Sequence, residues 1–298
     1  MPSPEHEAVV DSILSQPGGP APTSIAEMRA GLAEMVGYFQ ALEFPADVEQ
    51  SPVEAGVVPG FWFTPKSARE DRAVLYLHGG GYVMGSVATH RSLVGRIAQA
   101  AGVRCLALDY RLAPEHPFPA AVDDACAAYR WLLAQGIPAS GLVIAGDSAG
   151  GGLTLGSLVA LRDAGDPFPA AAVCLSPLTD LELTGASAHA DIDDPMVDRD
   201  GTRLMAEAYL QGANARDPRA SPLHADFTGF PPLLIEVGTR EILLDDARRV
   251  AQRAREAGVE VTLEEGEALT HVWQMHPHLP ESVASLERIA RFIRAQLD

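Results

Sequence analysis

The 298-residue chain has few of the residues from which disulfide frameworks, metal fingers and membrane anchors are built. Its three cysteines, Cys105, Cys126 and Cys174, are too scattered for a disulfide framework and lack the spacing of metal ligands. Each lies in an apolar stretch, so we expect three small buried side chains. No apolar run is long enough for a membrane span, and residues 1–7 lack a basic segment. We therefore expect a cytoplasmic protein with no signal peptide, no transmembrane helix and no stable membrane association.

Positive charge is also scarce. The chain carries 22 Lys and Arg against 40 Asp and Glu, which gives a formal net charge of −18, and Lys66 is the only lysine. A surface with this balance repels polyanions, so the composition argues against nucleic acid and anionic membranes as partners.

Groupings typical of metal sites are missing. Residues 180–230 are rich in aspartate, but the spacing does not match an EF-hand loop, and solvated surface is the simpler interpretation. His276 and His278 have no cysteine or carboxylate partner at ligand spacing, so we interpret both as surface-loop residues. We expect neither a metal nor an organic cofactor.

The most informative stretch runs from Leu142 to Gly152, where a short apolar strand leads into Gly-Asp-Ser-Ala-Gly. A helical pattern of small and apolar residues follows. Strand, tight turn and helix form the setting of a nucleophile elbow, with Ser148 as the nucleophile. Gly146 and Gly150 are expected because a Cβ at either position would meet the neighbouring strand or helix. The alternative is that Ser148 is a helix N-cap after a glycine turn.

Three further features favour the nucleophile. His78, Gly79, Gly80 and Gly81 follow an apolar run, and such a glycine loop offers backbone N–H groups that can stabilise a developing oxyanion. His271 lies in a loop late in the chain. The acidic residues that precede it, after the strand that ends near Val237, complete the order Ser, acid, His of an α/β-hydrolase.

These motifs together resemble the bacterial hormone-sensitive lipase family of esterases (family IV). The resemblance rests on the sequence around residues 78–81, on Asp-Tyr-Arg-Leu-Ala-Pro-Glu at 109–115 and the Pro-Phe-Pro-Ala that follows at 117–120, on the elbow at 146–151, and on the segments of Glu241 and His271. It covers most of the chain from about residue 70 onward. The N-terminal segment carries none of these motifs.

The resemblance implies an oxyanion hole made by the N–H groups of Gly80, Gly81 and Ala149. It also places His78 and Gly79 in the supporting loop, where His78 organises the loop rather than acting as a second base. Asp147, next to the nucleophile, is expected to accept hydrogen bonds that fix the surrounding loops.

The acid is the open assignment. Glu241 follows its strand directly, where the acid of this fold belongs. Asp245 and Asp246 lie in the first turn of the next helix, where they favour the helix dipole and can pair with Arg248 and Arg249. We favour Glu241 and keep Asp245 as the alternative.

Alternating buried strands and helices predict a mostly parallel sheet covered by helices on both faces, and the resemblance implies that this is an α/β-hydrolase fold. Residues 1–45 are predicted to be helical, and the resemblance places them in a cap. Residues 46–298 form the catalytic domain, and its polar insertion at about 180–230 is interpreted as the second half of the cap.

Together these features predict a serine carboxylesterase that acts on small, short-acyl esters through an acyl-enzyme. Three alternatives remain: an amidase or lactonase with the same triad, a non-catalytic ligand-binding homologue, and a structural or partner-binding protein. The alternating strand at 259–263 lies near the end of the predicted sheet order, and an exposed edge there would allow pairing across a homodimer.

Overall fold

The computed structural model describes residues 1–15, 21–190 and 192–298. Residues 16–20 of the predicted N-terminal helical segment, and Asp191 of the predicted insertion, lie outside these ranges.

The described residues form one eight-stranded sheet, in the order β1-β2-β4-β3-β5-β6-β7-β8. The two N-terminal strands run antiparallel to their neighbours, and β3 to β8 pair in parallel, which confirms the predicted sheet. The strands are β1 (Val48–Ala55), β2 (Val58–Pro65), β3 (Arg69–Leu77), β4 (Val103–Leu108), β5 (Leu142–Asp147), β6 (Ala171–Leu175), β7 (Leu233–Gly238) and β8 (Val261–Gly266).

The described helices alternate with the strands after an N-terminal pair. They are α1 (Pro4–Leu14), α2 (Ile25–Ala41), α3 (Val87–Ala101), α4 (Ala120–Ala134), α5 (Ala149–Ala164), α6 (Arg199–Leu210), α7 (Leu244–Glu256) and α8 (Pro280–Leu297). Four 3-10 turns lie at η1 (Ala139–Gly141), η2 (Ser187–His189), η3 (Pro222–His224) and η4 (Trp273–Met275).

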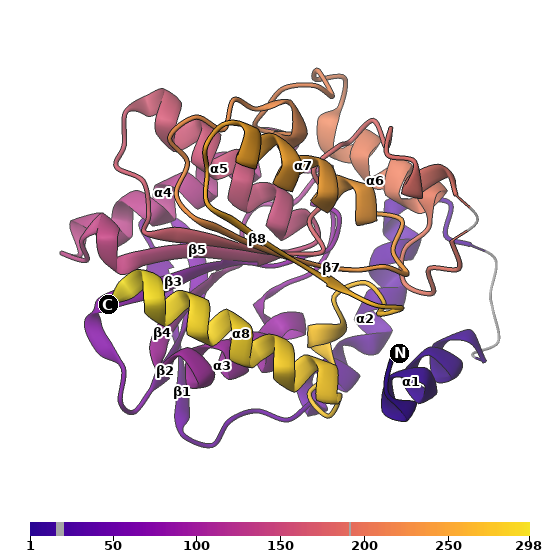
Figure 1. The fold of residues 1–298 in the computed structure, drawn as a ribbon, viewed down its shortest axis with the longest axis horizontal. Coiled ribbons are helices and arrows are strands. Elements are labelled where there is room, and N and C mark those ends of the chain that lie inside the picture. Colours follow the sequence, from indigo (N-terminus) through magenta and orange to yellow (C-terminus); the bar gives the residue numbers. More distant parts are fainter. Residues whose placement is uncertain (16–20, 191) are drawn as a thin grey trace.

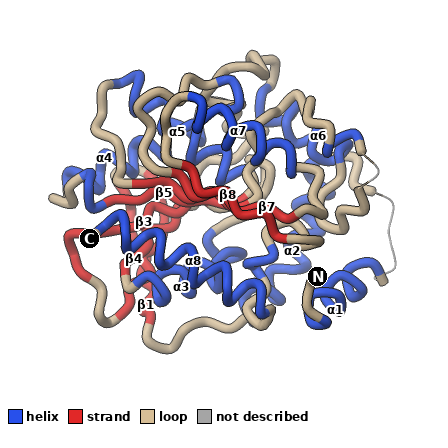
Figure 2. Tube along the Cα trace, in the orientation of Figure 1, coloured by secondary structure: helices blue, strands red, loops and turns tan. Residues whose placement is uncertain are grey.

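Helices cover both faces of the sheet. Helices α3 and α8 lie on one face and α4, α5 and α7 on the other, so that the strands form the middle of three layers (Figures 1 and 2). Side chains of β3 alternate between the two cores, with Leu75 and Leu77 on the α5 face and Val74 and Tyr76 on the α3 face. Because residues 73–77 of β3 are buried on both faces of the sheet, all five are apolar.

The predicted cap segments take the form expected from their periodicity. Helix α6 lies within the polar insertion, and the rest of residues 180–230 is loop and 3-10 turn where the structure describes it. Helix α2 contains no fully buried residue, although its sequence is largely apolar. Across the described ranges, no helix is both long enough and apolar enough to cross a bilayer.

Several local predictions need correction. The last strand begins at Val261 rather than at Val259, although it does lie at the edge of the sheet. His276 is half-buried rather than a surface residue, and burial lowers its pKa to about 4. The three cysteines are buried, as predicted.

Candidate active site

Ser148 occupies the sharp turn between β5 and α5, with φ of 53° and ψ of −122°. This is a backbone conformation that L-residues rarely adopt, and the surroundings hold it in place. The Ser148 N–H donates to Leu175 O (2.8 Å), and its carbonyl accepts from the N–H groups of Gly152 (3.1 Å) and Leu178 (3.0 Å). The turn is therefore fixed to the end of β6 and to the loop after it.

The two glycines of the elbow have the steric role that the sequence predicts. A Cβ on Gly146 would collide with Gly150 O in the helix and with Leu77 O in β3. A Cβ on Gly150 would collide with Leu77 O and His78 O. Helix α5 therefore reaches its position over the sheet only without side chains at these two sites.

Glu241 and His271 lie together at the same end of the sheet. Glu241 Oε2 is 2.8 Å from His271 Nδ1, and the Glu241 side chain is fully buried. Its other oxygen, Oε1, accepts from Ser176 Oγ (2.7 Å) and from Gly238 N (2.5 Å). Two donors on one oxygen leave the second oxygen facing the imidazole, so the orientation of the carboxylate is fixed.

Ser176 connects this pair to the elbow. It directly follows Leu175, whose carbonyl binds the N–H of Ser148, and its hydroxyl both donates to Glu241 and accepts from Val272 N (3.2 Å). One short segment thus contacts the elbow, the acid and the residue after His271. Among the hydrogen bonds of the described ranges, none joins the Ser148 hydroxyl to His271. Nothing in the sequence around Ser176 indicated this role.

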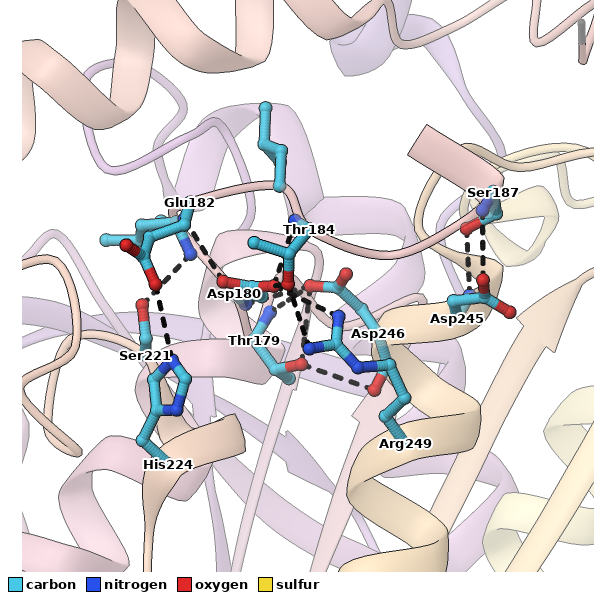
Figure 3. Close-up of polar contacts among 12 residues, drawn as sticks. Thr179, Asp180, Glu182, Thr184, Ser187, Ser221, His224, Asp245, Asp246 and Arg249 are labelled. Atoms are coloured by element: carbon cyan, nitrogen blue, oxygen red, sulfur yellow. Dashed lines mark hydrogen bonds and ion pairs between the residues drawn. The ribbon is translucent and has the colours of Figure 1, made fainter. Parts of the chain in front are cut away.

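The two other acids are engaged elsewhere (Figure 3). Asp245 accepts from Ser187 N (2.9 Å), and the Asp245 N–H donates to Ser187 Oγ (3.0 Å). Asp246 accepts from the N–H groups of Thr179 (2.7 Å) and Asp180 (2.9 Å). Both aspartates therefore bind the backbone of the segment that begins the insertion.

Their predicted arginine partners are only partly correct. Asp245 lies 4.0 Å from Arg248, as the i+3 spacing predicts. Arg249 pairs with Asp180 (3.0 Å) rather than with Asp246. Asp180 is fully buried, so its interpretation as solvated surface is wrong: the arginine and the Thr184 N–H (3.0 Å) compensate its charge in place of water.

Asp180, Glu182 and His224 bring one ligand atom each within 4.8 Å of one another, and all three are labelled in Figure 3. The Arg249 guanidinium binds the Asp180 carboxylate directly. A cation at this cluster would face that positive charge at close range, so we assign the cluster to anchoring the insertion.

Two opposing effects set the pKa of His271. Burial by itself lowers the pKa, because the imidazolium loses its hydration. The charge of Glu241 and its hydrogen bond outweigh burial, with smaller contributions from Asp194 and Asp147, and the net pKa is raised above the ordinary 6.5. Asp194, which accepts from the Ile242 N–H (3.1 Å), was not singled out from the sequence.

This balance predicts the pH dependence of turnover. In the role of general base that the sequence predicts for His271, only the neutral imidazole can accept a proton, so kcat/KM is expected to fall about tenfold per pH unit below a midpoint above 6.5. Asp194→Asn removes one charge that stabilises the imidazolium and is expected to move this midpoint to lower pH. A pH series of kcat/KM on both proteins measures the shift, and a midpoint unchanged in the variant would contradict this assignment.

The glycine loop follows β3 and faces the elbow. Gly80 and Gly81 have φ of 119° and 61°, which glycine adopts without strain. The Gly79 N–H is occupied, since it donates to Asp147 Oδ1 (3.1 Å). Among the hydrogen bonds of the described residues, none uses the N–H of Gly80 or Gly81. Ala149 is the first residue of α5, where backbone N–H groups lack intrahelical acceptors.

Asp147 has a polar environment that holds this loop. It accepts from Tyr76 Oη (2.8 Å) and Gly79 N on one oxygen, and contacts His90 Nε2 (3.1 Å) with the other. Burial alone would raise the pKa of Asp147, but His90 and the other donors lower it overall. His90 is buried on α3, and the sequence did not lead us to predict it as a site residue. Its position three residues before Leu93, on the same helical stripe, was the available signal.

His78 supports the loop from behind. Its ring stacks on Tyr110 with the ring centroids 4.3 Å apart, and Nδ1 lies 2.7 Å from Gly79 O. Burial lowers the pKa of His78 to about 4, so the ring is neutral at pH 7 and donates through Nδ1–H. These contacts hold the His78 ring between Tyr110 and the backbone of the glycine loop.

Known proteins share both the sequence and the fold. A family model described as the alpha/beta hydrolase fold matches residues 74–275. The chain is 51% identical over 253 residues to an acetyl-hydrolase of Streptomyces hygroscopicus, which covers 84% of this chain and 83% of the relative. It is 35% identical over 228 residues to an esterase of Acinetobacter venetianus, and the match covers 76% of this chain and 75% of that esterase.

Solved structures agree over the full length. An esterase from the bacterial hormone-sensitive lipase family superposes with a TM-score of 0.93 at 46% identity, covering 100% of both chains. The esterase EstE5, from a crystal soaked with p-nitrophenyl butyrate, gives a TM-score of 0.93 at 43% identity, with 99% of each chain covered. The chain therefore belongs to the bacterial hormone-sensitive lipase family of esterases, within the α/β-hydrolase fold, as its motifs predict.

Proposed function

We propose that this chain is a serine carboxylesterase that hydrolyses small, short-acyl esters through an acyl-enzyme. The observation that carries the proposal is the 2.8 Å hydrogen bond between Glu241 and His271 Nδ1, beside the elbow that presents Ser148. With Nδ1–H donating to the carboxylate, the lone pair of Nε2 is left to accept a proton. This tautomer is the one that a serine nucleophile requires.

In the first half-reaction, Ser148 Oγ bonds to the ester carbonyl carbon while His271 Nε2 takes the hydroxyl proton. The carbonyl electron pair moves onto oxygen and returns as the bond to the alkoxy group breaks. His271 then gives its proton to the departing alcohol. Water repeats the sequence on the acyl-enzyme, which releases the carboxylic acid and restores Ser148. Each step uses groups of this chain, substrate and water.

The N–H groups of Gly80, Gly81 and Ala149 are proposed to bind the oxyanion. Two of them lie in a loop whose glycine conformations turn the backbone away from internal acceptors. The third begins a helix, where the dipole favours negative charge. Fixed amide donors of this kind commonly contribute about 100-fold to 1,000-fold each to kcat.

A short acyl group is favoured by a close contact above the glycine loop. Met205, from α6, lies so near Gly81 that a Cβ on this glycine would collide with Met205 Sδ. Helix α6 therefore closes the space over the loop. The acetyl-hydrolase of Streptomyces hygroscopicus and the p-nitrophenyl butyrate used with EstE5 point in the same direction.

A chain-length series tests the proposal. We expect a burst of p-nitrophenol equal to the enzyme concentration, and kcat/KM highest for acetyl to butyryl esters and at least about tenfold lower for decanoyl esters. A p-nitroanilide of the same acyl group serves as the comparison. Faster turnover of the anilide would favour the amidase, and equal binding of the esters without turnover would favour a non-catalytic homologue.

A further inference from the structure

Helix α2 packs on its neighbours with a half-buried face, and Arg29 on it makes side-chain hydrogen bonds to distant loops. It lies beside α3 and α6, and none of its residues is fully buried (Figure 1). Arg29, in its second turn, reaches out of the helix and makes four short hydrogen bonds. Such a helix, with little buried apolar surface, depends on contacts of this kind for its position.

Two of these hydrogen bonds go to backbone carbonyls of the loops next to the elbow. Arg29 Nε donates to Val83 O and Nη2 to Ala113 O, both at 2.7 Å. The same guanidinium pairs with both oxygens of Glu115, also at 2.7 Å each. The geometry uses the planar fork of arginine, which a lysine cannot reproduce.

Val83 and Ala113 are themselves tied to the glycine loop. The Val83 N–H donates to Gly80 O (3.1 Å), and the Ala113 N–H donates to Tyr82 O (3.0 Å). Arg29 therefore completes a chain of hydrogen bonds from the cap helix, through Val83, to the peptide that follows Gly80. The N–H of Gly81 belongs to that same peptide.

We propose that Arg29 is a positioning residue for the oxyanion hole, through which the N-terminal cap helix sets the orientation of the Gly81 amide within the pair of Gly80 and Gly81 donors. The inference rests on the proposed function, because it assigns those amides to the oxyanion. Arg29 touches neither the nucleophile nor the base in this arrangement. Its contribution is to hold the donors where charge develops on the substrate oxygen.

The ion pair with Glu115 is the smaller part of this role. The Arg29 and Glu115 side chains are 33% and 57% exposed, and an ion pair in that setting is screened by water. The two carbonyl hydrogen bonds reach the loop itself. Glu115→Gln keeps them, Arg29→Lys can make at most part of them, and Arg29→Met loses both.

The experiment measures kcat and KM of these variants per active site, counted by burst titration with p-nitrophenyl acetate. We expect kcat of Arg29→Met to fall about tenfold to a hundredfold, with KM changed less than about threefold and the pH midpoint of kcat/KM unchanged. Arg29→Lys should lie between Arg29→Met and wild type. Glu115→Gln should stay within about threefold of wild type.

Arg130→Met is the matched control, since Arg130 on α4 makes a similar surface pair (2.6 Å) with Asp166, in the loop after α5. It should keep the wild-type kcat. A merely structural role of Arg29 would lower the thermal midpoint or the fraction of active sites but leave kcat per site unchanged, and that result would overturn the inference. Failure of the proposed function is separate: wild-type enzyme would then show no burst.

Discussion

Ser148→Ala is expected to lower kcat by about a hundred-thousandfold or more. The loss follows from the removal of the atom that forms the acyl-enzyme, since His271 and the amide donors act on that bond and cannot replace it. The burst of p-nitrophenol should disappear together with turnover. Steady-state and stopped-flow assays on p-nitrophenyl acetate measure both, and mass spectrometry of acid-quenched enzyme should find an acetyl adduct in wild type alone.

Ser157→Ala provides the control on the same helix. Ser157 is buried on α5, and its hydroxyl has no hydrogen-bond partner in the part of the chain that the structure describes. Its removal should therefore leave activity unchanged and stability equal or slightly higher. Turnover by Ser148→Ala above about 1% of wild type, in protein free of wild-type contamination, would show that Ser148 is not the nucleophile.

The parts of the fold that could be predicted are those determined by the local sequence pattern. Buried parallel strands such as β5 and β6 appear as apolar runs, and the elbow requires Gly146 and Gly150 where its strand and helix meet. The full strand order was not predicted, because β4 and β3 exchange places relative to the chain. Local pattern alone does not contain that exchange.

The parts that escaped prediction are contacts between distant segments. Ser176 binds Glu241 and Asp180 binds Arg249, each 65 or more residues away along the chain. A serine or aspartate in a loop has no local pattern that reveals such a partner. His90 is different, because a histidine within an apolar helical stripe indicates a buried polar contact. Its partner, Asp147, still depends on how α3 packs on the sheet.

The same long-range contacts explain how the acid loop keeps its shape. The insertion binds the loop on both sides of Glu241: Arg240 pairs with Asp193 (2.5 Å), and Ser187 Oγ donates to Ile242 O (2.7 Å). The polar insertion therefore supports the loop that carries Glu241. Contacts of the residues on both sides of Glu241 fix this loop, and the loop presents the carboxylate in the orientation that the proposed triad requires.

Glu241→Gln is expected to lower kcat by about a thousandfold. In the wild type, the Gly238 N–H and the Ser176 hydroxyl both donate to Oε1 of the Glu241 carboxylate. The carbonyl oxygen of glutamine will take that position, because an amide NH₂ there would face two donors. Its NH₂ group then faces His271 Nδ1 and stabilises the tautomer that carries its proton on Nε2. In that tautomer the imidazole cannot accept the proton of Ser148.

Asp245→Asn is the matched comparison, since it makes the same chemical change four residues away. The Asp245 carboxylate accepts from Ser187 N, a bond that the asparagine oxygen can keep, so kcat should stay within about threefold of wild type. The kcat of Glu241→Asp should lie between those of Glu241→Gln and Asp245→Asn, because the shorter side chain withdraws the carboxylate from the imidazole. Loss of activity in Asp245→Asn, with Glu241→Gln still active, would reassign the acid to Asp245.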